Sequence, residues 1–318
     1  GLGFDFKWNM GWMNDMLHYM SLNSMWRPFN HDSLTFSFYY AFSEKFLLPI
    51  SHDEVSHGKG SLIKQMPGKY DEQFAGVRAF ITYMYAHPGK KLVFMGTEIG
   101  QFDEWNSTEQ LQWNLLGYEK HRQLNHFFAT ANKFYCDTPA MHENDYDWNG
   151  FQWIALDDYK HSIISFRRIA YDGSEVIVVC NFQPMLRENY KIGVPKFGIY
   201  KEVLNSEAEE FGGCGIVNEG ELKAQDATDH DLPYSINITL APLSVIYIEL
   251  DKELPAPEKP KEKKTTNRKA AALKKAKAEK AAKAESKAEE KVDEKPVVEE
   301  KEETKETKAE EKIETVEE

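Results

Sequence analysis

The sequence contains few cysteines and no long hydrophobic run. Its three cysteines, Cys136, Cys180 and Cys214, are odd in number and far apart, which fits neither a disulfide framework nor a zinc site and favours a reducing cytoplasm. The most apolar region, residues 79–95, is interrupted by a His-Pro-Gly turn and two lysines, so no run reaches the about 18 residues of a membrane span. Neither a membrane segment nor a secretory signal is expected.

Aromatic residues are absent after Asp251. Residues 251–318 consist mainly of Lys, Glu, Ala, Thr and Pro, so they cannot bury a core, and we expect a disordered, low-complexity tail. The tail is mainly basic at first and mainly acidic from Glu285, so the net charge of -13 describes no single surface. An acidic total disfavours a nucleic-acid-binding protein, although a lysine-rich tract that contacts nucleic acid or an acidic partner is the alternative to a solvated tail.

Strand and helix patterns alternate in the first part of the chain. Alternating aromatic residues at Phe4, Phe6 and Trp8 predict a strand, and an apolar residue at every fourth position over residues 31–46 predicts a helix. The same reasoning predicts further helices at residues 13–20, 71–84 (capped by Asp71) and 123–134, and strands at residues 47–50 and 92–95. This alternation indicates parallel βαβ units, with candidate site loops after each strand.

Short alternating runs replace the helical patterns from about residue 145. Turn residues separate most of these runs, which predicts an antiparallel sandwich as a separate domain. The predicted strands are residues 151–156, 162–168, 175–181, 189–194, 199–204, 234–240 and 244–250. The expected fold class is therefore α/β followed by all-β, with the charged tail at the end.

The stretch LLPISHDEVSHGK, residues 47–59, is the strongest candidate for chemistry. A short apolar run suits a buried strand, and it stops abruptly at His52, Asp53 and Glu54. Asp53 would then emerge at the carboxyl end of the strand, which is the catalytic rim of a β/α barrel. A neutral polyol is the ligand that such a carboxylate and a neighbouring donor suit, because carboxylates accept hydrogen bonds from hydroxyls and nearby tryptophans pack on sugar rings.

Three other interpretations of this stretch are weaker. A metal site formed by His52, Glu54 and His57 is disfavoured because the two histidines are five residues apart at a strand end, whereas the helical zinc motif places its histidines four apart. A Ser-His-Asp triad is disfavoured because Ser51, His52 and Asp53 are consecutive, and consecutive strand residues point to opposite faces. The third interpretation, that Asp53 only caps a helix, remains open.

Long strings of the sequence resemble one enzyme family. They are GLGFDFKWNMGWMNDML, LPISHDEVSHGKGSLIKQMPG and GKKLVFMGTEIGQFDEWN, followed by ENDYDWNGFQWIALDD and VVCNFQP. In this order and spacing they resemble the C-terminal part of bacterial glycogen (1,4-α-glucan) branching enzymes, which are members of the α-amylase superfamily. The resemblance covers roughly residues 1 to 250 and leaves out the tail.

The resemblance implies a fold and a reaction. Residues 1–142 would form the C-terminal portion of a catalytic (β/α)8 barrel, and residues 143–250 the all-β domain. The reaction is a retaining transfer of a glucan chain to a 6-hydroxyl, which uses two carboxyls about 5 to 5.5 Å apart. Asp53 corresponds to a third carboxylate, which stabilises the transition state, and His52 would donate to the same sugar. Glu98, Gln101 and Trp105 are candidates for further glucan contacts; no metal or organic cofactor is implied.

This sequence departs from the family in its catalytic residues, which limits the activity that we expect of it. The family's nucleophile aspartate and acid glutamate lie upstream of the GLGF string, where this sequence begins. We therefore expect a C-terminal fragment of a cytoplasmic branching enzyme, monomeric in its full-length form and inactive as this piece. The alternatives are a related α-glucan-active enzyme, such as a debranching or maltosyl-transferring relative, and a non-catalytic glucan-binding or scaffolding module.

Overall fold

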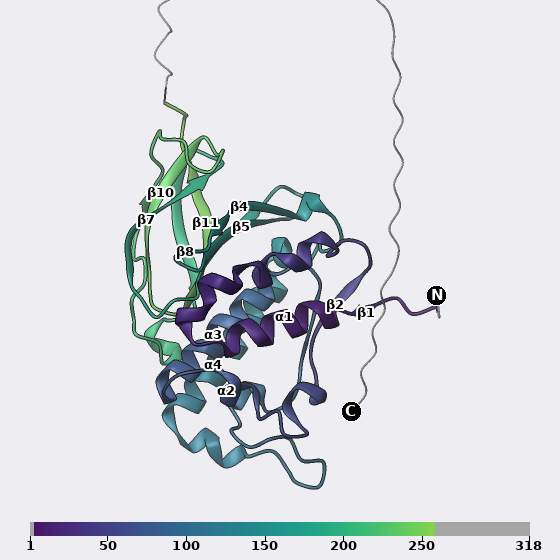
Figure 1. Cartoon of the computed structure of the whole chain (residues 1–318). Coiled ribbons are helices and arrows are strands. Elements are labelled where there is room, and N and C mark those ends of the chain that lie inside the picture. The colour runs from purple at the N-terminus through teal and green to yellow at the C-terminus, as the bar shows by residue number, and fades with distance from the viewer. Residues whose placement is uncertain (1–2, 258–318) are drawn as a thin grey trace, which may run out of the picture. The chain divides into compact units, whose positions relative to one another are not determined.

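A short parallel sheet organises the first part of the molecule. The computed structural model describes residues 3–257; residues 1–2 and 258–318, which include most of the predicted tail, lie outside the described part. The sheet consists of β1 (Lys7–Trp8), β2 (Phe46–Ile50) and β3 (Lys90–Val93), in that order. Both strand pairs are parallel, which confirms the predicted βαβ arrangement (Figure 1).

Strand β1 is shorter than predicted. Its residue Lys7 pairs with Phe46, the first residue of β2, so residues before Lys7 have no strand beside them. Phe4 and Phe6 therefore lie outside the strand, and the Phe4 side chain is 84% exposed. Strand β3 begins and ends two residues earlier than predicted, because its pairing with β2 starts at Lys90, opposite Leu47. The Lys90 ammonium group donates to Asp145 Oδ2 at 3.0 Å.

Residues 3–257 contain four α-helices. They are α1 (Met10–Ser21), α2 (Leu62–Gln65), α3 (Tyr70–Ala86) and α4 (Glu119–Asp137), so the three helices predicted at residues 13–20, 71–84 and 123–134 are confirmed. Asp71 is not the cap of α3, because Lys69 occupies that position; Asp71 lies in the first turn, where the helix dipole favours a negative charge. Among residues 3–257, no helix is long and apolar enough to cross a membrane.

The helix predicted over residues 31–46 is wrong. The chain forms two 3-10 helices instead, η1 (Ser24–Leu34) and η2 (Phe36–Tyr39), followed by turns. Leu34 and Phe38 are buried, as the spacing predicted. The backbone around them, however, forms hydrogen bonds from residue i to residue i−3, such as that from Phe38 N to Thr35 O at 3.1 Å. The segment is rich in Asn, Asp, Ser and Thr, whose side chains compete with α-helical hydrogen bonds and favour turns.

Two antiparallel sheets form the second part of the molecule. Six strands lie in the order β4-β5-β6-β11-β8-β9, and β7 pairs with β10. All seven predicted strands are present, as β4 (Phe151–Asp158), β5 (Ile163–Ile169), β6 (Glu175–Asn181), β7 (Arg187–Val194), β8 (Gly198–Asn205), β10 (Tyr234–Leu240) and β11 (Ser244–Glu253), with β9 (Leu222–Lys223) added. Ile177, Ile192 and Ile236, from both sheets, share one buried cluster, so the sheets pack as a sandwich.

Short 3-10 helices also occur in the segments that connect the helices and strands. They are η3 (His52–Val55), η4 (Thr97–Ile99), η5 (Trp113–Gly117), η6 (Pro139–Met141), η7 (Trp148–Gly150) and η8 (Glu209–Phe211). Two of them, η3 and η4, directly follow β2 and β3 and so shape the loops at the carboxyl ends of these strands.

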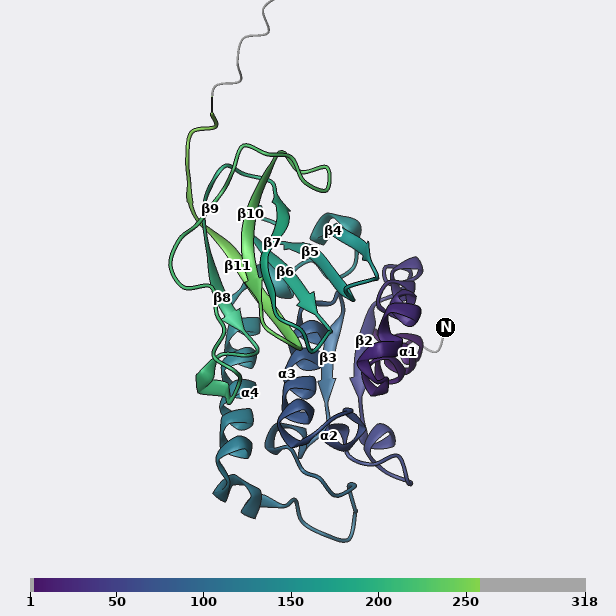
Figure 2. The same cartoon turned by 60° about the vertical axis from the view of Figure 1, so that its left-hand side comes forward.

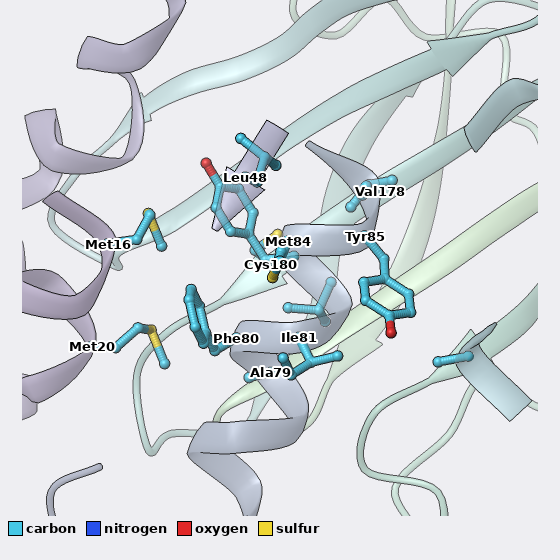
Figure 3. Close-up of a cluster of buried hydrophobic side chains, with 14 of the residues drawn as sticks. Met16, Met20, Leu48, Ala79, Phe80, Ile81, Met84, Tyr85, Val178 and Cys180 are labelled. Atoms are coloured by element: carbon cyan, nitrogen blue, oxygen red, sulfur yellow. The ribbon is translucent and has the colours of Figure 1, made fainter. Parts of the chain in front are cut away.

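Helix α3 lies between the parallel sheet and the sandwich (Figure 2). Every residue from Phe74 to Ala86 is buried, as expected of a helix that is covered on all sides. Figure 3 shows Phe80 and Met84 of α3 between Met16 of α1 and Cys180 of β6. One hydrophobic core therefore joins the α/β part to the sandwich, and residues 3–257 lie within one compact unit.

Two buried ion pairs also connect the two parts. Arg78 of α3 pairs with Glu207, after β8, and their side chains are 1% and 6% exposed. Arg78 Nε also donates to Ser206 O at 2.7 Å, and Glu207 Oε2 accepts from the Cys214 amide at 3.1 Å. Arg168 of β5 pairs with Asp145 at 2.6 Å and donates to Ala86 O, at the end of α3, at 2.8 Å.

Replacing Glu207 with alanine should destabilise the chain strongly. The substitution leaves the Arg78 guanidinium buried without a counter-charge, which typically costs about 3 to 5 kcal/mol. Asp251→Ala is the control, because it removes an exposed carboxylate that pairs with Lys201 at 2.8 Å, and such pairs contribute at most about 1 kcal/mol. The free energy of unfolding in urea measures both; equal losses would contradict the role of the buried pair.

Acid should destabilise the fold through His87. This histidine is fully buried, its Nε2 lies 3.1 Å from Ser37 Oγ and its Nδ1 2.8 Å from Pro88 O. Burial lowers the pKa of His87 from 6.5 to about 3. Below pH 6.5 the His87 imidazole is therefore protonated in the unfolded chain but stays neutral in the folded chain. The free energy of unfolding then falls by up to about 1.4 kcal/mol per pH unit as the pH drops below 6.5.

The pH dependence of urea unfolding between pH 6.5 and 5, above the range where most carboxylates titrate, tests this directly. In His87→Asn the stability should change less steeply with pH over this window than in the original chain. The same steepness in both proteins would show that His87 is not the responsible group.

Candidate functional site

The candidate site begins where β2 ends at Ile50. Ser51 caps the 3-10 helix His52–Val55 by accepting a hydrogen bond from the Asp53 amide at 3.2 Å. Glu54 Oε2 in turn accepts from the Ser51 amide at 2.6 Å and from Ser51 Oγ at 2.7 Å, which completes a capping box. Ser51 is therefore the cap, and the interpretation that Asp53 caps a helix is wrong.

Asp53 and His52 present their side chains to solvent next to each other. Their side chains are 53% and 47% exposed, and His52 Nε2 lies 3.3 Å from Asp53 Oδ1. The tight turn of η3 brings these consecutive residues together, although consecutive residues of a strand would point apart. Ser51 is buried and its hydroxyl is used in the cap, so the three residues do not form a catalytic triad.

Trp105 joins this pair from the loop after β3. Its amide donates to Val55 O at 3.0 Å, which links the loop to the end of η3. The Trp105 ring packs edge-to-face against His52, with 5.8 Å between ring centroids, and against Phe94 at 5.1 Å. An aromatic ring, an imidazole and a carboxylate thus meet at the carboxyl ends of β2 and β3, an arrangement that suits a hydroxyl-rich ring.

The two other predicted site residues, Gln101 and Glu98, do not contact the His52–Asp53 pair in the way that Trp105 does. Gln101 lines a small cavity together with Trp105 and Met95, and its Oε1 accepts from the Gln112 amide at 3.1 Å. Glu98 is not among the residues that line this cavity, and its carboxylate accepts from the Gly96 amide of its own turn at 2.8 Å. Of the five predicted site residues, Asp53 and Trp105 each lie against His52, Gln101 lines the same cavity as Trp105, and the Glu98 carboxylate is bonded within its own turn.

The supporting roles of two residues, Glu54 and Glu104, were missed in the sequence. Glu54 is buried and fixes the turn that carries Asp53; its signal was the Ser-x-x-Glu spacing of a capping box at residues 51–54. Glu104 Oε1 accepts from the Gly60 amide at 2.6 Å, and hydrogen bonds from the Gly60 and Gly58 amides lower the pKa of Glu104. No local pattern signals Glu104, because its partner Gly60 lies 44 residues away.

Comparison with a family model and with solved structures first defines the class of fold. Residues 153–251 match the family model described as "Alpha amylase, C-terminal all-beta domain". Among solved structures, AmyP in complex with maltose has a TM-score of 0.52 at 13% identity, over 80% of this chain and 51% of that chain. Pullulanase type I from Bacillus subtilis has a TM-score of 0.54 at 11% identity, over 76% of this chain and 35% of that chain. The fold is therefore that of the C-terminal region of α-amylase-like enzymes.

Sequence relatives then confirm the resemblance to the branching enzymes. The 1,4-alpha-glucan branching enzymes GlgB of Halothermothrix orenii and Aquifex aeolicus are 51% and 50% identical over 250 residues, which is 78% of this chain. The GlgB of Synechocystis is 46% identical over 251 residues. The chain is thus homologous to bacterial branching enzymes of the α-amylase superfamily, and it spans 40% of the length of the first two relatives and 33% of the third.

Ser51→Ala should loosen the turn that carries Asp53. The substitution removes the cap and one of the two hydrogen bonds to Glu54, and loss of such a cap costs about 0.5 to 2 kcal/mol. Amide hydrogen exchange of residues 51–56 should therefore become faster, while exchange in α3 stays unchanged. Lys59→Ala, an exposed change in the same loop, is the control; equal acceleration in both variants would contradict the capping role.

Proposed function

We propose that this chain supplies the glucan-binding carboxylate of a 1,4-α-glucan branching enzyme. The observation that carries the proposal is the His52–Asp53 pair at the end of β2, with the Trp105 ring packed against His52. Relatives of that name, 46 to 51% identical over about 250 residues, support it. The substrate is an α-1,4-glucan, such as amylose or glycogen chains, and the reaction transfers a cleaved chain to a 6-hydroxyl.

The geometry suggests how these residues act on the sugar. The exposed Asp53 carboxylate accepts hydrogen bonds from hydroxyls of the glucose at the cleaved bond, and His52 donates to the same ring. Such contacts favour a flattened, positively charged ring in the transition state, and one preorganised contact is worth about 3 to 4 kcal/mol. Trp105 and Gln101 are proposed to contact neighbouring glucose units. Glu98 is the weakest of the proposed contacts, because its carboxylate is engaged by its own turn.

The three parallel strands suit a part of a (β/α)8 barrel. In such a barrel the catalytic groups lie at the carboxyl ends of the strands, which is where Asp53 and Trp105 are found. We propose residues 1–142 as the C-terminal portion of that barrel and the residues from 143 as the all-β domain, with a charged tail after it. The boundary predicted at residue 250 is wrong by at least three residues, because residues 251–253 belong to β11. Strand β11 continues to Glu253, so a variant without the tail should end after Pro257.

We further propose that this chain does not branch glucans alone. By the resemblance, the nucleophile aspartate and the acid glutamate belong to barrel strands that precede the GLGF string, and no pair of carboxylates in this chain matches their motifs. The chain would then contribute Asp53, while the upstream part of a cytoplasmic, monomeric enzyme contributes the two reacting groups.

Asp53→Asn tests the assigned role in a complete enzyme. The upstream portion of the Halothermothrix orenii relative, joined to this chain, supplies the preceding barrel strands. In that protein Asp53→Asn should lower the branching rate by about 10² to 10³-fold without loss of stability, because the amide presents one acceptor fewer and no charge. Asp226→Asn, an exposed change in the sandwich, should leave the rate unchanged. Near-normal activity of Asp53→Asn would refute the role.

A further inference from the structure

His57 is an exposed histidine that the glucan site described above leaves unused. It lies in a tight turn over residues 56–59, which is closed by a hydrogen bond from Lys59 N to Ser56 O at 3.3 Å. Both central residues of this turn are left-handed, with φ of 59° at His57 and 84° at Gly58. Asparagine and glycine are the preferred residues at such positions, so the backbone itself does not require an imidazole here.

A second turn of the same kind shows an imidazole with a local role. His230 and Asp231 are its two left-handed residues, with φ of 46° and 61°, between the bridged residues Asp229 and Leu232. The His230 ring is held by the neighbouring carboxylate, because its Nδ1 lies 2.5 Å from Asp229 Oδ2. The His57 ring, in contrast, has no hydrogen bond, ion pair or aromatic neighbour within residues 3–257. Its partner is therefore to be sought outside the protein.

The turn that carries His57 begins against the glucan site. Ser56, the first residue of the turn, is buried, and its Oγ donates to His52 O at 2.7 Å. His52 Nε2 in turn lies 3.3 Å from Asp53 Oδ1. His57 therefore directly follows a residue that is fixed to the backbone of the His52–Asp53 pair.

Glu104 holds the other side of the turn. Hydrogen bonds from the Gly60 amide, at 2.6 Å from Oε1, and from the Gly58 amide lower the pKa of Glu104. The charge of His57 acts in the same direction, so the imidazole lies near this carboxylate. Glu104 directly precedes Trp105, whose ring packs against His52. The turn is thus fixed between the two loops that form the glucan site, with the imidazole exposed.

We propose that His57 is a further glucan contact, which hydrogen-bonds a hydroxyl group of a glucose unit next to the one held by Asp53. A neutral imidazole has one donor and one acceptor, so it suits a hydroxyl group, which can donate and accept. This inference rests on the proposed function, because it extends the same site along the glucan chain. The contact lies away from the cleaved bond, so it contributes to binding of the chain and not to the chemical step.

His57→Gly tests this contact in the hybrid of this chain with the upstream portion of the Halothermothrix orenii relative. Glycine adopts the left-handed conformation without steric cost, which offsets the freedom that it adds to the unfolded chain, so the urea midpoint should change little. Loss of one hydrogen bond should raise the KM for amylose about threefold to tenfold, while kcat changes by less than about twofold.

Two further variants show whether the imidazole itself is responsible. His230→Gly is the matched control, because it makes the same exchange at an exposed left-handed position of the sandwich, and the KM should stay unchanged. His57→Asn keeps a side chain that donates and accepts hydrogen bonds and that tolerates the left-handed conformation. Its KM should therefore lie between those of the original hybrid and His57→Gly.

The outcomes separate this contact from the function on which it rests. An unchanged KM in His57→Gly, an equal rise in His230→Gly, or a loss confined to kcat would overturn the role of His57 while the unaltered hybrid still branches amylose. An unaltered hybrid that folds but neither binds nor branches amylose would refute the proposed function, and the contact with it.

Discussion

The burial of α3 on all sides is the constraint on which the rest of the structure depends. The parallel sheet covers one side of this helix and the sandwich covers another, so neither part has a complete core without the other. Two buried arginines cross the same boundary: Arg78, in the middle of α3, pairs with Glu207, and Arg168 of β5 donates to Ala86 O in the last turn of α3. The sandwich is therefore a structural support for the strands that carry the site.

The site itself depends on loops that two carboxylates, those of Glu54 and Glu104, hold by hydrogen bonds. Glu54 holds Ser51, and with it the turn of His52 and Asp53, while Glu104 holds the following glycine-rich segment at Gly60. Both carboxylates accept hydrogen bonds from backbone amides, and Glu54 also accepts from the Ser51 hydroxyl, so the exposed Asp53 carboxylate takes no part in the cap. A glucan-binding group of this kind must be positioned accurately yet remain accessible to hydroxyls, and the division of roles between Glu54 and Asp53 achieves both.

Much of the fold could be predicted from the sequence because local patterns and tertiary packing agree there. The sandwich strands alternate cleanly, and α1, α3 and α4 carry helical spacing, so their predictions are confirmed. The helix predicted over residues 31–46 failed because apolar spacing alone does not distinguish an α-helix from consecutive 3-10 turns. In the site, the strand end at Asp53 was predictable, whereas the contact of Trp105 with His52 and the hydrogen bond of Glu104 are set by loops far apart in the chain.

The most direct test of the account is an assay of the purified 318-residue chain on amylose, with near-UV circular dichroism to show that it is folded. Iodine colour and the number of α-1,6 branch points report the reaction, and binding of maltooligosaccharides reports the site. We predict that the folded chain binds maltooligosaccharides through Asp53, His52 and Trp105 but forms no branch points. Branch formation would mean that other carboxylates of this chain perform both reacting roles, which would contradict the proposed mechanism.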